Sequence, residues 1–174
     1  MVDWIPSNKI ARWRTPAEKW SRQTGCPAAL ILAVIQQESG GCETATRFEA
    51  DFLANNPKLE PRVRLIMQRC SLSQSAVTTS YGLMQLMLTT AWGYLSEADK
   101  GPQVVAALLD PDKNIRYSAA HLGALLKKHK RGAVIDAAVI RAVAGAYNGA
   151  KSESAYARNV CALWRKYETW LQEV

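Results

Sequence analysis

The sequence lacks the features that mark several classes of protein. No apolar run approaches the about 18–20 uncharged residues needed to cross a bilayer, and the longest extends only from Pro27 to Ile35. The N-terminus has no basic segment leading into an apolar stretch, so we expect no secretory signal. The cysteines form no CxxC pair and the two histidines bring no partner at ligand spacing, which argues against a zinc site. The sequence therefore predicts a soluble protein without a metal centre or a membrane-inserted segment.

The composition predicts one well-packed domain with a basic surface. The chain has 174 residues, of which 48% are hydrophobic and 21% are charged, enough to bury a core. Its formal net charge of +7 favours an anionic partner, but charge alone does not choose among nucleic acid, anionic lipid and another anionic polymer. The one tight basic cluster, Lys127 to Arg131 before Gly132, is typical of the last turn of a helix rather than of a nucleic-acid site. The cysteines leave the disulfide state open, with small buried thiols as the simplest interpretation: Cys26, Cys42, Cys70 and Cys161.

Hydrophobic spacing predicts helices in the first third of the chain, and no convincing run of alternating strand residues occurs anywhere. Thr15 to Glu18 matches a capping box, and Gly25 is placed to end that helix. A second helix from Pro27 to Glu38 is apolar on every face for two turns, so we expect it inside the protein. The glycines, asparagines and proline of residues 39–57 predict an irregular loop there.

The rest of the chain continues this helical spacing. Asp110 and Pro111 cap the clearest amphipathic helix. Its predicted apolar face consists of Ile115, Ala119, Leu122, Leu126 and His129. Four further helical segments are predicted at Pro61 to Cys70, Gly82 to Leu95, Asp136 to Asn148 and Ser152 to Leu171. One face of the last segment consists of Tyr156, Val160, Leu163, Tyr167 and Trp170.

No internal repeat or linker-like segment divides the chain. We expect residues 1–25 to form an N-terminal helical extension that packs on a core domain of residues 26–174. The predicted fold class is therefore mainly α, with a single domain.

Glu38 is the first candidate for chemistry. It directly follows the fully apolar helix and precedes Ser39, Gly40 and Gly41, where the helix must stop. A carboxyl at a helix C-terminus faces the negative end of the dipole, and apolar neighbours disfavour its ionised form. Both effects favour the protonated carboxyl that a general acid needs near neutral pH. The structural alternative is a capped, partly exposed glutamate at a helix end.

Two further segments carry polar groups among apolar ones. From Ser80 to Gln85, a glycine opens a predicted helix and Gln85 stands among apolar residues, which by itself is typical of a buried helix start. From Ala146 to Gly149, an apolar helix ends in Tyr-Asn-Gly, which by itself is typical of a helix stop with Asn or Gly in the left-handed conformation.

Together the three segments are more specific than any one of them. Glu-Ser-Gly-Gly at 38–41, Tyr-Gly-Leu-Met-Gln at 81–85 and Ala-Tyr-Asn-Gly at 146–149 occur in this order. This set resembles the catalytic domain of the soluble lytic transglycosylases, relatives of goose-type lysozyme. Tyr156 resembles a further landmark of that family. The resemblance covers residues 26–165 and implies a lysozyme-like α fold with a glycan cleft.

The resemblance also implies a substrate and a set of site residues. The family cuts the β-1,4 bond between N-acetylmuramic acid and N-acetylglucosamine in peptidoglycan glycan strands. Glu38 resembles its single catalytic acid, while the segment ending at Gln85 resembles a cleft wall and Tyr147 a tyrosine near the acid. The substrate-binding residues expected from the resemblance are Ser39, Ser80, Met84, Gln85, Tyr147 and Asn148.

The implied mechanism needs one carboxyl and no cofactor. Glu38 would protonate the leaving oxygen and then take a proton from the C6 hydroxyl of the muramic acid, giving a 1,6-anhydro end without consuming water. A goose-type muramidase is the hydrolytic alternative and would need a second carboxylate. Glu43, Glu49 and Asp51 lie in the next loop, although each is typical of a solvated charge or a partner of an arginine such as Arg47.

A non-catalytic binding module for cell wall or nucleic acid is the alternative from another class. It would rest on the basic charge and on six tryptophans, most of which helical spacing assigns to the core: Trp4, Trp13, Trp20, Trp92, Trp164 and Trp170. We expect an anionic cell wall rather than nucleic acid as the partner, and a monomer.

The expected site of action is the periplasmic cell wall. Without a visible signal, such an enzyme needs a holin, a virion or a secretion machine to reach it. We therefore expect a phage endolysin or virion-associated lysin, with a chain trimmed of its leader as the alternative.

Overall fold

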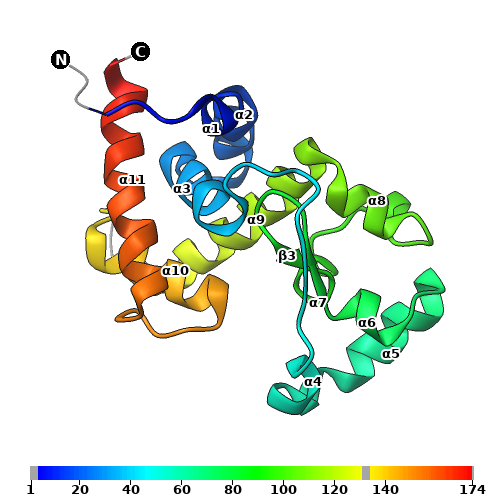
Figure 1. Ribbon diagram of the computed structural model, residues 1–174. Coiled ribbons are helices and arrows are strands. Elements are labelled where there is room, and N and C mark those ends of the chain that lie inside the picture. Colours follow the sequence, from blue (N-terminus) through cyan, green and yellow to red (C-terminus); the bar gives the residue numbers. More distant parts are fainter. Residues whose placement is uncertain (1–3, 131–133, 174) are drawn as a thin grey trace. The chain divides into compact units, whose positions relative to one another are not determined.

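The computed structural model describes residues 4–130 and 134–173 (Figure 1). The chain groups into two compact units, and one boundary between them falls within a long helix. We call Met1–Gly41 together with Ala119–Val174 the helical unit, and Cys42–Ser118 the sheet unit. Helices predominate in the described residues, which confirms the predicted mainly α fold class.

The helical unit is organised around one apolar helix, α3. Its elements are α1 (Asn8–Ala11), α2 (Arg14–Thr24), α3 (Ala28–Ser39), the second part of α9 (Pro111–His129), α10 (Ala137–Asn148) and α11 (Ala155–Glu173). Helices α1, α2 and α11 all contact α3, and α10 packs on α11. Seven consecutive residues of α3, from Ala29 to Ile35, are buried, as the apolar run predicts. Because burying a leucine or isoleucine side chain contributes about 2 kcal/mol, α3 is the main core element of this unit.

Two helices of this unit end at the glycines that the sequence predicts, but one predicted helix start is wrong. Gly25 and Gly149 adopt left-handed φ angles of 72° and 71° and end α2 and α10, as predicted. The capping box predicted at Thr15 is wrong, because α2 begins one residue earlier, at Arg14. Pro16 then lies in the first turn, where its missing N–H removes no helical hydrogen bond. Arg14 Nε also contacts Glu18 Oε1 at 2.8 Å, one turn along the helix.

The two long helices bury the faces that their spacing predicts. Asp110 caps α9, since the backbone N–H of Lys113 donates to Asp110 Oδ1 at 2.9 Å. Ile115, Ala119, Leu122 and Leu126 of α9 are buried, as are Val160, Tyr167 and Trp170 of α11. The basic cluster supplies the last turn of α9, which ends at His129, whereas Arg131 and Gly132 lie outside the described residues.

The sheet unit combines a small antiparallel sheet with short helices. Its elements are β1 (Thr46–Phe48), α4 (Phe52–Asn55), η1 (Pro57–Leu59), α5 (Glu60–Cys70), α6 (Gln74–Val77), β2 (Thr79–Tyr81), β3 (Leu86–Met87), α7 (Leu88–Ala91), η2 (Glu97–Asp99), α8 (Val104–Leu109) and the start of α9. The strand order is β1-β2-β3, with Thr46 opposite Tyr81 and Ser80 opposite Met87. The prediction that the chain has no strands is therefore wrong, and β1 lies inside the loop predicted at residues 39–57. Strands of two or three residues are too short for an alternating pattern to be visible.

The helix predicted from Gly82 to Leu95 is also wrong. The chain turns at Gly82, whose φ is 75°, before it enters β3 and α7. A Cβ at Gly82 would lie 2.6 Å from Asn114 Nδ2, so only glycine fits there. The buried Asn114 side chain holds this turn, because its Nδ2 donates to the carbonyls of Tyr81 and Leu108 at 2.8 Å each. Its Oδ1 also accepts from the backbone N–H of Met84 at 2.9 Å.

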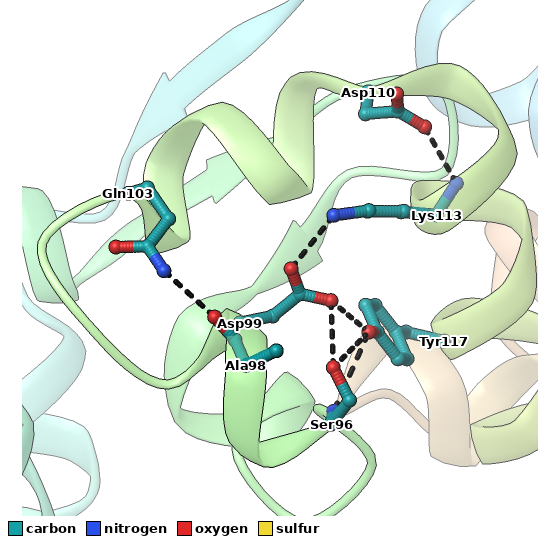
Figure 2. A network of polar contacts seen from close by, with 7 residues as sticks. All are labelled: Ser96, Ala98, Asp99, Gln103, Asp110, Lys113 and Tyr117. Carbon is teal, nitrogen blue, oxygen red and sulfur yellow. Dashed lines mark hydrogen bonds and ion pairs between the residues drawn. The ribbon is translucent and has the colours of Figure 1, made fainter.

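A second polar network fastens η2 to α9 (Figure 2). The buried carboxylate of Asp99 accepts hydrogen bonds from Lys113 Nζ at 2.7 Å, from Ser96 Oγ at 2.9 Å and from Tyr117 Oη. Burial raises the pKa of Asp99, but the hydrogen bonds from these three side chains and the charge of Lys113 outweigh it. The net effect lowers the pKa of Asp99 below its ordinary value, so the network holds an ionised carboxylate at neutral pH.

Candidate active site

Glu38 lies in the last turn of α3, half-buried beyond the fully buried stretch of that helix. The helix ends at Gly40, which has a left-handed φ of 59°, and Gly41 follows with a φ of 84°. A Cβ at Gly41 would lie 2.5 Å from the carbonyl oxygen of Lys9, so this turn requires glycine. The rigid core helix therefore fixes the backbone of Glu38, and two glycines direct the chain away immediately after it.

The carboxylate of Glu38 contacts a residue far along the chain. Tyr156 Oη donates to Glu38 Oε1 at 2.5 Å, across 118 positions of sequence. Tyr156 lies in the first turns of α11, the helix that packs most extensively on α3. A second α11 tyrosine, Tyr167, donates to Gln36 Oε1 two residues before Glu38. Sequence reasoning included Tyr156 as a family landmark and not as a site residue, and its place on the predicted face of α11 was the available signal.

Ser39 completes the end of α3. Its hydroxyl donates to the carbonyl of Ile35 at 3.3 Å and accepts from the backbone N–H of Gly41 at 3.2 Å. Both contacts are of the kind that satisfies the free backbone groups at a helix end. A contact between Ser39 and substrate stays a prediction.

Tyr147 and Asn148 form the last turn of α10, in the same unit as Glu38. Asn148 is exposed, and Gly149 takes the left-handed position after it. The half-buried ring of Tyr147 lies 5.5 Å from the ring of His121 on α9, at an interplanar angle of 40°. Burial lowers the pKa of His121, so Tyr147 faces a neutral imidazole at neutral pH.

The remaining predicted residues belong to the sheet unit, where they surround the turn between β2 and β3. Gln85 Nε2 donates to the carbonyls of Ala45 at 2.9 Å and Gly82 at 3.0 Å, so this side chain joins the start of β1 to the turn. Gln85 also has a φ of 46°, a left-handed conformation that costs a non-glycine residue free energy. Ser80 and Met84 are buried, at 3% and 0% exposure. Their contact with substrate stays a prediction.

The three carboxylates considered for a hydrolase also lie in the sheet unit. Glu49 Oε1 contacts Arg47 Nε at 2.5 Å, the ion pair that the sequence predicts. Asp51 is exposed before α4, and Glu43 is half-buried. The ion pair directs the Glu49 carboxylate to Arg47, which makes it less available than an unpaired carboxylate to act as a base.

Comparison with known families decides what these motifs represent. A family model described as the transglycosylase SLT domain matches residues 15–160. The chain belongs to this family. A search of curated proteins gave no match. Membership of the SLT family confirms the resemblance drawn from the three motifs and the lysozyme-like α fold class, and it makes peptidoglycan the polymer on which this type of domain acts.

Several other features of this SLT domain bear on its chemistry. Its four cysteines are free thiols, three of them buried and Cys42 exposed. Within the described ranges, 4–130 and 134–173, no three His, Cys, Asp or Glu side chains are grouped to hold a metal ion. Each helix described is too short or too polar to cross a membrane. All six tryptophans are buried or half-buried, as their helical spacing predicts for most of them.

Proposed function

We propose that this SLT domain is a lytic transglycosylase that cleaves the bond between N-acetylmuramic acid and N-acetylglucosamine, with Glu38 as general acid and then general base. Family membership supports the class of reaction. The observation that carries the assignment of Glu38 is its position at the end of the buried helix α3, where Tyr156 donates to its carboxylate. A catalytic carboxyl needs a fixed direction, and a core helix with a hydrogen-bonding tyrosine provides one.

In the proposed reaction Glu38 first gives up a proton and then takes up another. The carboxylic acid of Glu38 gives its proton to the glycosidic oxygen, the bond from C1 to that oxygen breaks, and the N-acetylglucosamine end departs as an alcohol. The N-acetyl oxygen of the muramic acid stabilises the positive charge at C1. The Glu38 carboxylate then takes the proton of the C6 hydroxyl, whose oxygen bonds to C1. The product is a 1,6-anhydro ring, and Glu38 is again protonated.

Tyr156 is proposed as the residue that positions Glu38. Its hydroxyl is held by α11, so the hydrogen bond ties the direction of the carboxyl to the packing of α11 on α3. The carboxylate that must accept the second proton is therefore held in one direction by this hydrogen bond. The remaining substrate-binding residues inferred from the family are kept as part of the proposal: Ser39, Ser80, Met84, Gln85, Tyr147 and Asn148.

The proposal is tested by replacing the carboxyl while keeping its shape. Glu38→Gln is expected to lower the rate of peptidoglycan cleavage by about a thousandfold or more, because the amide neither gives nor takes the proton. Release of soluble muropeptides from purified peptidoglycan measures the rate, and circular dichroism checks that the fold is retained. The matched control is Glu49→Gln, which removes an ion-paired carboxyl and is expected to keep most of the activity.

Two outcomes would contradict the proposal. A Glu38→Gln protein as active as the wild type would remove Glu38 from the chemistry. If neither wild type nor variant released products, yet both bound peptidoglycan equally, the chain would be a wall-binding module.

A further inference from the structure

The net charge of the chain is confined to one of its two units. The helical unit has fourteen lysines and arginines against seven aspartates and glutamates, a formal charge of +7. The sheet unit has eight of each sign and is neutral. Within the helical unit, residues 4–24 carry five basic residues and only one acidic residue, Glu18. The attraction of this protein for an anionic partner therefore comes from the helical unit.

Aromatic rings and cations alternate where the N-terminal segment meets the C-terminal half of α11. Lys166 Nζ lies 5.5 Å from the centre of the Trp4 ring, and the Trp4 ring meets Tyr167 edge-on at 5.0 Å. The Tyr167 ring lies 6.2 Å from Trp170, which in turn lies under the guanidinium of Arg14 at 5.1 Å. Figure 1 shows the first described residues passing across the C-terminal part of α11 on the way to α1. We call the surface formed by Trp4, Ile5, Arg14, Lys166 and Trp170 the cation–aromatic surface.

One residue of this surface presents an apolar side chain to solvent. Ile5, next to Trp4, is 73% exposed, the largest exposure among the large hydrophobic side chains described as exposed. Lys166 is exposed as well, and so are Lys9 and Arg165 nearby in sequence. The charged ends of Lys166 and Arg14 lie over the rings of Trp4 and Trp170, in the geometry of cation–π contacts. The surface thus combines the exposed aliphatic side chain of Ile5, the half-buried indole of Trp4 and the exposed cation of Lys166, while Arg14 is paired with Glu18.

We propose that the cation–aromatic surface binds peripherally to the surface of a bilayer that contains anionic phospholipid. Tryptophan with lysine or arginine suits the boundary between headgroups and acyl chains, where one part of a side chain is apolar and the other polar. Lysine and arginine attract anionic headgroups. A soluble anionic polymer would use the charges but would gain nothing from an exposed isoleucine, and for this reason a lipid surface fits better than nucleic acid or a wall polymer. The contact is a surface one, and it does not require a helix that crosses the membrane.

The test uses the full chain and vesicles of known composition. The protein is expected to cosediment with vesicles of phosphatidylglycerol mixed into phosphatidylcholine, and not with vesicles of phosphatidylcholine alone. Lys166→Gln is expected to weaken binding about fivefold, the effect of one cation near an anionic membrane surface. The matched control Lys58→Gln removes an exposed lysine from the neutral sheet unit and is expected to bind as the wild type does.

The contribution of the exposed isoleucine to vesicle binding is tested with a second variant and its control. Ile5→Ser is expected to weaken vesicle binding several-fold, because the isoleucine no longer enters the headgroup layer. Leu65→Ser is the control, since Leu65 is 51% exposed on α5 of the sheet unit. All four variants are expected to cleave peptidoglycan at the wild-type rate, and Glu38→Gln is expected to bind vesicles normally, which separates this proposal from the proposed reaction.

Three results would overturn the inference. The first is equal binding to vesicles with and without phosphatidylglycerol. The second is an equal loss of binding for Lys166→Gln and Lys58→Gln, which would mean that overall charge acts and not this surface. The third is full binding by Ile5→Ser, which would indicate a purely electrostatic contact of the kind made with a soluble polyanion.

Discussion

Both units of this SLT domain have an apolar core, but the two units differ in the polar side chains buried within them. Among the described residues, every buried polar or charged side chain lies in the sheet unit: Thr78, Ser80, Gln85, Thr89, Asp99, Asn114 and Ser118. The helical unit instead buries an unbroken apolar helix, α3, against α2 and α11. Apolar packing is non-directional and tolerates adjustment, whereas a buried polar group costs free energy unless a partner stands in one direction. The helical unit therefore provides a stable platform for Glu38, and the sheet unit provides turns of fixed shape.

The largest expected effect comes from removing the polar centre of the sheet unit. Asn114→Ala is expected to lower the free energy of unfolding by about 4 kcal/mol, because three buried backbone groups lose their partner at once. Urea unfolding measures the loss. The matched control is Asn148→Ala on the exposed end of α10, with an expected change below about 0.5 kcal/mol. Equal losses for the two asparagines would remove the distinction drawn between the units.

Two tyrosine substitutions, one in each unit, test the same difference between the units, and their expected effects on stability are smaller. Tyr117→Phe in the sheet unit removes a hydrogen bond to the Asp99 carboxylate and is expected to cost about 2 kcal/mol. Tyr167→Phe in the helical unit removes a hydrogen bond to the neutral amide of Gln36 and is expected to cost about 1 kcal/mol. Both tyrosines are almost fully buried, so the change in buried area is matched. A larger loss for Tyr167→Phe would contradict the view that charged networks hold the sheet unit.

The smallest expected effect is the response to acid. The pKa of Asp99 is lower in the folded protein than its ordinary value of about 3.9, so its network stabilises the fold above that pH. This stability is lost as the pH falls below about 4 and through the lower folded-state pKa, where the folded carboxylate takes up its proton. Melting temperatures followed toward acid pH should therefore fall less steeply for Asp99→Asn than for the wild type. Parallel curves for the two proteins would show that Asp99 does not contribute.

The success of sequence reasoning also differs between the units. In the helical unit, apolar spacing predicted α3, the buried face of α11 and the glycine that ends α10, because each depends on residues within a few turns of one another. In the sheet unit, the same reasoning missed β1 and assigned a helix after Gly82. The turn there depends on Asn114, which bonds to Tyr81 across 33 positions, and no local pattern reports such a partner.

The residues of the candidate site also differ in how far they could be predicted from the sequence. Glu38 was identifiable because a long apolar helix ends in a carboxyl followed by two glycines, a local signal. Its partner Tyr156 stands 118 positions away, so helical spacing and the family resemblance pointed to the tyrosine but not to its hydrogen bond with Glu38. Gln85 stands among apolar residues in the sequence, and its side chain is hydrogen-bonded in the interior, but its acceptor at Ala45 lies 40 positions earlier. Local chemistry was predictable, and the pairing of distant groups required the structure.

In the proposed reaction Glu38 performs both proton transfers and water takes no part. The most direct measurement is mass spectrometry of the soluble products from purified peptidoglycan, before and after borohydride reduction, with Glu38→Gln alongside. The proposed reaction gives anhydro-muropeptides that resist reduction from the wild type, and Glu38→Gln is expected to release no products. Reducible muramic acid ends would contradict it, because they would show that water had been the nucleophile and that a second carboxylate, such as Glu43 or Asp51, assists it.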